Sequence, residues 1–86
     1  MTLDDWLAAA EREGPEISNR CQAFAHALRK KGTDHWHLGA ENAAGAPEAF
    51  VSVVLMCTQL TDAGWLRHDW QNATYWPAIP AKEMTQ

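Results

Sequence analysis

Apolar residues recur at helical spacing from the start of the chain, which predicts a first helix over residues 3–13. Thr2 is a candidate N-cap, and the carboxylates of Asp4 and Asp5 suit the positive end of the helix dipole. A Gly-Pro pair at residues 14–15 ends this segment and begins the next.

A second helix is predicted over residues 15–31, because one stripe collects its apolar positions: Ile17, Cys21, Phe24, Ala25 and Leu28. The basic run Arg29-Lys30-Lys31 suits the negative end of this helix, and Gly32 stops it.

A third helix is predicted over residues 47–63, between a proline start and a glycine stop at Gly64. Apolar residues nearly encircle its first two turns, so we expect it to be buried on more than one side. Val54 and Leu55 are therefore expected to be core residues.

The remaining segments suggest short strands. Residues 34–38 alternate polar and apolar, with Trp36 and Leu38 on the expected buried side, and a short helix over 40–44 follows. Residues 65–70 and 74–79 form a two-stranded ribbon, whose second strand the prolines at 77 and 80 place at an edge. The sequence thus predicts one mainly α domain over 1–86 with a small C-terminal β-hairpin and a loose tail over 80–86.

Composition supports a folded, non-secreted domain. Of 86 residues, 47% are apolar and five are Trp, which is enough for one core. Cys21 and Cys57 lie inside helical patterns, as free buried thiols do. Two acids stand where a signal peptide needs basic residues, and no apolar run reaches the roughly 18 residues of a membrane span. We expect a cytoplasmic protein without a membrane partner.

The order helix, short strand, short helix, long helix, strand, turn, strand resembles the winged helix-turn-helix family, and the helix end QLTDAGWL resembles the entry to its first wing strand. The resemblance covers residues 15–79 and leaves 1–13 as an added helix. The predicted fold is therefore winged-helix-like, with three main helices in all and a two-stranded wing. It implies a small DNA-binding transcriptional regulator. Its basic surface would comprise Arg20, Arg29, Lys30, Lys31 and Arg67.

Charge disfavours that function. The chain has 11 Asp+Glu against 7 Lys+Arg, a formal net charge of -4. Residues 39–64, which include the expected recognition helix, contain no Lys or Arg. A surface without cations has little to neutralise phosphates.

Residue patterns for catalysis or metal binding are weak. His35 and His37 share one strand face, but a zinc site needs three or four ligands, and surface histidines flanking a buried Trp give the same pattern. No Gly-rich phosphate loop, G-x-S-x-G or H-E-x-x-H motif occurs. We expect a non-enzymatic protein without metal or cofactor.

Aromatic residues concentrate in the ribbon, which has one face to bury against helices. Either they cap the core, or some remain exposed and contact another protein. The second interpretation predicts a small acidic protein-interaction module, with a homo-oligomer left open. In size and charge it is similar to phage and mobile-element inhibitors of bacterial defence complexes, such as anti-CRISPR proteins. The predicted partner-binding residues are Trp65, Arg67, His68, Trp70, Tyr75 and Trp76.

Overall fold

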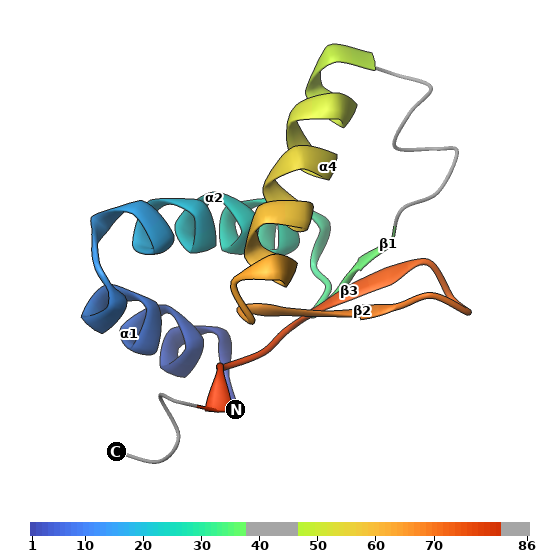
Figure 1. Cartoon of the computed structure of the whole chain (residues 1–86). Helices are drawn as coiled ribbons and strands as arrows, with labels where there is room; N and C mark the ends of the chain where they lie inside the picture. The colour runs from blue at the N-terminus through green and yellow to red at the C-terminus, as the bar shows by residue number, and fades with distance from the viewer. Residues whose placement is uncertain (38–46, 82–86) are drawn as a thin grey trace.

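The protein is mainly helical with a small antiparallel sheet (Figure 1). The computed structural model describes residues 1–37 and 47–81, except for the side chains of 47–52. No helix in these ranges is long and apolar enough to cross a membrane. The elements are α1 (Leu3–Glu13), α2 (Pro15–Lys31), β1 (Trp36–His37), α4 (Pro47–Asp62), β2 (Leu66–Asp69) and β3 (Thr74–Pro77).

The helix boundaries confirm the three main helices predicted from the sequence, with α4 one residue shorter than expected. The predicted strand over 34–38 is reduced to the two residues of β1 within the described range. The predicted short helix over 40–44 and residues 82–86 of the predicted tail lie outside the described residues.

Helix α1 begins with a capping box at Thr2. The Asp5 backbone N–H donates to Thr2 Oγ1 at 3.1 Å, and the Thr2 N–H donates to Asp5 Oδ2 at 3.2 Å. The backbone N–H and hydroxyl of Thr2 hold the pKa of the Asp5 carboxyl below its usual value. Two orphan groups of the helix start are therefore satisfied reciprocally.

Helix α2 ends at Gly32, which adopts the left-handed conformation with φ 69°. The N–H of Gly32 donates to the Arg29 carbonyl, and the N–H of Thr33 donates to the Leu28 carbonyl. This arrangement satisfies carbonyls of the last turn and redirects the chain toward β1.

The described residues form a sheet of three strands in the order β1-β3-β2, so the predicted two-stranded ribbon was incomplete. β1 adds to the hairpin through the pairs Trp36↔Tyr75 and His37↔Thr74. The expectation that prolines hold β3 at an edge was wrong, because β3 is central. Pro77 is tolerated there because it pairs with Leu66 of β2 and lies beyond the end of β1.

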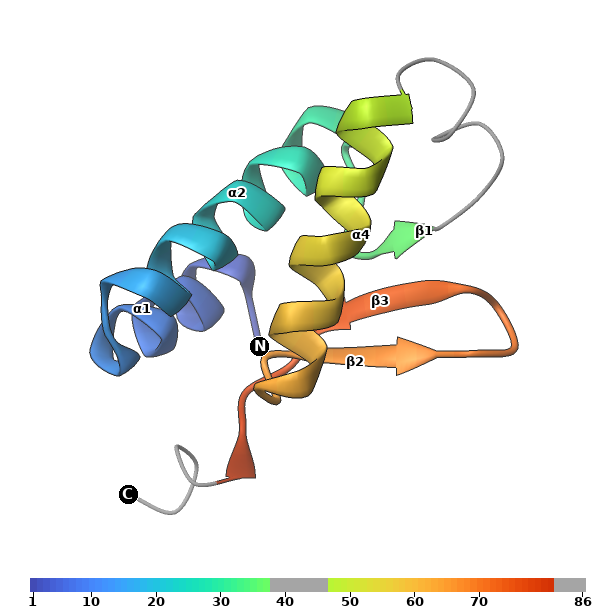
Figure 2. The same cartoon turned by 45° about the horizontal axis from the view of Figure 1, so that its top comes forward.

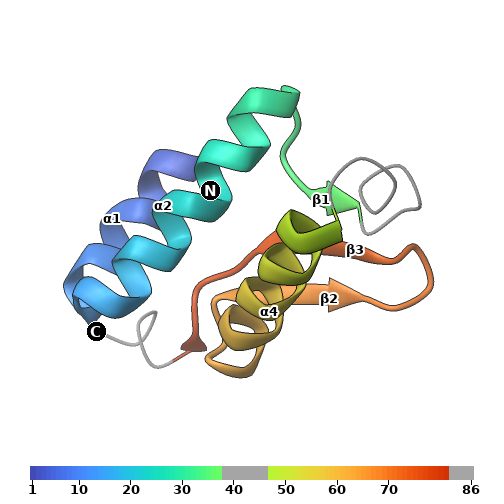
Figure 3. The same cartoon turned by 90° about the horizontal axis from the view of Figure 1, so that it is seen from above.

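Trp6 joins α1 to the residue before β2 and the residue after β3. Its indole Nε1–H is shared between the Trp65 carbonyl at 3.1 Å and the Ala78 carbonyl at 2.9 Å. The same ring meets Phe24 of α2 edge to face, with centroids 5.8 Å apart. Helices α1 and α2 lie side by side, and α4 crosses the sheet (Figure 3). The core includes Trp6, Cys21, Phe24, Leu28, Cys57, Leu60 and Trp65.

Over residues 53–62, where its side chains are described, helix α4 is less enclosed than its sequence predicted. Cys57 and Leu60 are fully buried, whereas Val54 is half-buried and Leu55 is 58% exposed. The expectation that Leu55 is a core residue was therefore wrong. One side of α4 faces the helices and sheet, and a leucine remains on the side turned away from the core.

Candidate interaction surface

The hairpin projects away from the helices, so both faces of its outer part are candidates for contact (Figure 2). Asp69 holds the turn at its tip: its carboxylate accepts from the Asn72 side-chain amide at 2.8 Å and from the backbone N–H groups of Gln71 and Asn72. These hydrogen bonds, the Asn72 amide first, lower the pKa of the Asp69 carboxyl. The turn is thus fixed by its own side chains, with Ala73 at a positive φ of 52°.

One face of the sheet carries a row of three side chains, from Arg67 of β2 and Trp76 of β3 to His35, which immediately precedes β1. The ring of Trp76 stacks on His35 with centroids 4.4 Å apart, and the Arg67 guanidinium lies 5.7 Å from the Trp76 ring centroid. The indole N–H of Trp76 also donates to Thr74 Oγ1 at 3.2 Å. Trp76 is therefore half-buried between its neighbours and is not a free aromatic anchor.

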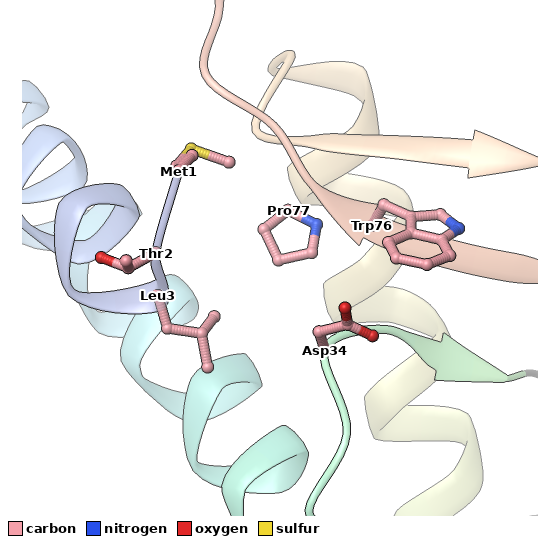
Figure 4. A pocket seen from close by; sticks show the side chains of 6 residues that line it. All are labelled: Met1, Thr2, Leu3, Asp34, Trp76 and Pro77. Atoms are coloured by element: carbon pink, nitrogen blue, oxygen red, sulfur yellow. The ribbon is translucent and has the colours of Figure 1, made fainter.

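A surface pocket of about 260 Å³ lies where this row meets the N-terminal end of α1 (Figure 4). Pro77 and Asp34 lie between Leu3 on one side of it and Trp76 on the other, and the Asp34 carboxylate is directed toward the Trp76 ring. Asp34 Oδ1 accepts a hydrogen bond from His35 Nδ1 at 2.9 Å, which lowers the pKa of the carboxyl. The lining residues are Met1, Thr2, Leu3, Asp34, Trp76 and Pro77.

The opposite face carries a continuous aromatic stack of Tyr75, His68 and Trp70. The imidazole of His68 lies parallel to the Tyr75 ring with centroids 4.2 Å apart, and Trp70 tilts against the same imidazole at 4.1 Å. Tyr75 is nearly buried, and burial raises the pKa of its hydroxyl. Trp70 is 83% exposed, so the stack runs from the core to solvent.

A second pocket, of about 240 Å³, lies between this stack and the C-terminal half of α4. Its helical wall is polar: the hydroxyls of Thr58 and Thr61 donate to the Val54 and Cys57 carbonyls of their own helix. Its other lining residues are Asp62, His68, Trp70 and Tyr75. We call the six lining residues the α4–hairpin pocket.

The predicted partner-binding set divides between the core and two sheet faces. Trp65 is 1% exposed, so the prediction that it contacts a partner was wrong. It begins the hairpin, and its backbone carbonyl accepts from Trp6. His68, Trp70 and Tyr75 come together in the aromatic stack, whereas Arg67 and Trp76 lie on the opposite face.

Four of the five residues in the predicted basic surface have partners within the chain. Arg20 pairs with Glu16 at 2.8 Å, and Arg29 pairs with Asp4 at 2.7 Å. Lys31 Nζ lies 4.7 Å from the Trp36 ring centroid, and Arg67 lies over Trp76. Lys30 is exposed at the end of α2.

Within residues 1–37 and 47–81, no group of three or more His, Cys, Asp or Glu side chains is placed to hold a metal ion. His35 is occupied by Asp34 and Trp76. Burial raises the pKa values of the Cys21 and Cys57 thiols to about 12, so both are protonated at neutral pH. Protonated buried thiols are poor nucleophiles and poor ligands.

The contribution of α4 to this surface was not predicted from the sequence. Leu55, Thr58 and Asp62 follow helical i, i+3, i+7 spacing and so share one side of α4. Asp62 lies in the last turn of α4, where the helix dipole favours a cation, and this sequence signal could have indicated the contribution of α4.

Comparison with known proteins found no matching family model, no matching curated protein and no matching solved structure.

Proposed function

We propose that this chain is a non-enzymatic protein-interaction module whose partner binds the aromatic stack and the adjacent side of α4. The observation that carries the proposal is the position of Trp70, which is 83% exposed beside a hydrogen-bonded turn. An exposed Trp loses little rotamer freedom when it binds, because its contact with His68 already restrains the ring. Such a side chain is typical of an interface hot spot.

Leu55 extends this surface along α4. It lies three residues before Thr58 of the pocket wall, on the same side of the helix. A partner covering Trp70 and Leu55 would remove two large exposed apolar side chains from water. Between them the α4–hairpin pocket offers polar groups that set orientation and specificity.

The experiment replaces Trp70 with a photo-crosslinking phenylalanine analogue in cells that produce the protein. Gln22, exposed on α2, is the control position. The proposal expects one protein crosslinked from position 70 and not from position 22, and a purified partner that binds Trp70→Ala at least about tenfold more weakly. Equal crosslinking from both positions, or unchanged affinity, would refute it.

A winged-helix DNA-binding regulator is the second candidate. It is favoured by one observation: α4 directly precedes the hairpin, and β1 joins that hairpin in one sheet. Against it stand the absence of Lys and Arg from α4 and the internal partners of Arg20, Arg29 and Arg67. Titration with random duplex DNA at several salt concentrations separates the two functions. A regulator binds with steep salt dependence, and the interaction module binds negligibly.

A further inference from the structure

We infer that the α4–hairpin pocket is a binding site for an arginine side chain of the partner protein. The inference rests on the proposed function, because it names the partner group that this surface recognises. Three features support it: the end of helix α4, the carboxylate of Asp62 and the exposed Trp70 ring that lines the pocket.

Helix α4 differs from the other helices at its C-terminal end. The last turn of α1 contains Arg12, and that of α2 contains three basic residues. The last turn of α4 contains no basic residue and ends with Asp62. Partial negative charge from the helix dipole and a full negative charge from the carboxylate therefore reinforce each other at one wall of the pocket. A cation supplied from outside would relieve this repulsion.

Asp62 is exposed and has no ion pair or hydrogen bond with the described part of the chain. Asp69, which lies between His68 and Trp70 in the sequence, is occupied by Asn72 and Gln71 and does not line this pocket. Asp62 is therefore the carboxylate in the pocket that remains available to a ligand.

The aromatic wall also favours a cation. Trp70 lines the pocket, and the face of an indole ring attracts a cation placed over it. Tyr75 is 5% exposed and stacks against His68, so the ring open to a cation is that of Trp70. Trp70 has one side against His68 and is 83% exposed, so its outer surface is open to a ligand. Carboxylate and ring thus line one surface hollow of about 240 Å³.

Arginine fits this combination better than lysine. A planar guanidinium can stack on a ring and donate two parallel hydrogen bonds to a carboxylate, whereas an ammonium is a compact and more strongly hydrated charge. The net charge of -4 adds a field that attracts a basic segment.

The test uses the intact chain and three capped tripeptides, Gly-Arg-Gly, Gly-Lys-Gly and Gly-citrulline-Gly, followed by NMR. Citrulline keeps the shape of arginine but is neutral. The arginine peptide should bind saturably, shifting the Trp70 indole N–H and the backbone amides of Thr61 and Asp62. It should bind about threefold or more tightly than the lysine peptide, and the citrulline peptide should bind negligibly.

Variants locate the site. Asp62→Asn removes the carboxylate charge, and Trp70→Leu removes the ring; each should weaken arginine binding about threefold or more. Glu11→Gln is the matched control, because Glu11 is exposed on α1 and its loss changes the net charge equally. That control should bind as the wild type does, and melting curves verify that every variant is folded.

Equal weakening by Glu11→Gln and Asp62→Asn would show binding through net charge alone and overturn the inference. Equal binding of arginine and citrulline, or shifts elsewhere on the surface, would overturn it as well. Failure of this inference is distinguishable from failure of the proposed function. A partner that depends on Trp70 while the pocket rejects arginine refutes only this inference, whereas arginine binding without a Trp70-dependent partner refutes only the interaction module.

Discussion

Trp65 and Trp70 lie five residues apart, at opposite ends of β2, and have opposite environments. Trp65 is 1% exposed, and its carbonyl accepts a hydrogen bond from the Trp6 indole N–H, so it joins the hairpin to α1. Trp70 is 83% exposed and contacts the ring of His68. The same residue type therefore closes the core at one end of the strand and is presented to solvent at the other.

The difference follows from the length of the hairpin relative to the helices. Helix α4 packs on β2 near its start, and the tip extends beyond the helices (Figure 2). Among the described residues, Trp65 before the strand is buried and contacts Trp6 of α1, whereas Trp70 after its end is 83% exposed. We attribute stability to the covered end and partner binding to the tip.

The largest expected effect is at the covered end. Trp65→Ala should lower the free energy of unfolding by about 3–5 kcal/mol, because it empties a large buried volume. Trp70→Ala should change it by about 0.5 kcal/mol or less. Urea denaturation of both variants measures the contrast, and equal losses would contradict the division between the two ends.

The two leucines of α4 provide a matched comparison on one helix. Leu60→Ala should cost about 2–5 kcal/mol, since Leu60 is fully buried. Leu55→Ala should cost about 0.5 kcal/mol or less, because Leu55 is 58% exposed. Thermal and urea unfolding measure both. A large loss from Leu55→Ala would mean that this side of α4 is covered in the monomer.

A smaller effect is expected from Trp6→Phe, which keeps an aromatic ring against Phe24 but removes the indole N–H. The Trp65 and Ala78 carbonyls then lose a donor, which should cost about 1–3 kcal/mol. Amide hydrogen exchange should rise at the start of β2 more than in α2. Unchanged exchange there would contradict the role of this indole in holding the hairpin.

The smallest expected effect is the loss of stability at acid pH. Hydrogen bonds lower the pKa values of the Asp5 and Asp69 carboxyls in the folded protein. Their contribution to stability is therefore present above about pH 4 and is lost as pH falls through the folded pKa. Between about pH 5 and about pH 2.5 the melting temperature should fall less for Asp69→Asn than for the wild type, because the variant lacks one of these titrations. An equal or larger drop for the variant would contradict this.

Local patterns were sufficient to predict the helices. The capping residue Thr2, the proline starts at 15 and 47, and the glycine stops at 32 and 64 are all local, and the structure has helices between them. Gly64 has a positive φ of 87°, and a Cβ there would meet Pro80 at 3.3 Å, so the stop also has a packing reason. The β1–β3 pairing joins residues 36 and 75, and no local pattern specifies so distant a contact.

The candidate site was only partly predictable for the same reason. The concentration of aromatic residues identified the hairpin as the candidate surface. Alternation alone could not show that Trp65 is buried and Trp70 exposed, because exposure depends on how the helices pack on the sheet. The pocket wall formed by Thr58, Thr61 and Asp62 was missed, since it depends on how α4 lies relative to the hairpin.

The most direct test of the central claim is the affinity of the crosslinked partner for Trp70→Ala, measured beside the unfolding free energy of the same variant. We predict affinity weakened about 30-fold, equivalent to about 2 kcal/mol, with stability within about 0.5 kcal/mol of the wild type. Unchanged affinity, or a loss of binding matched by a loss of folding, would contradict the claim that the hairpin tip is reserved for a partner.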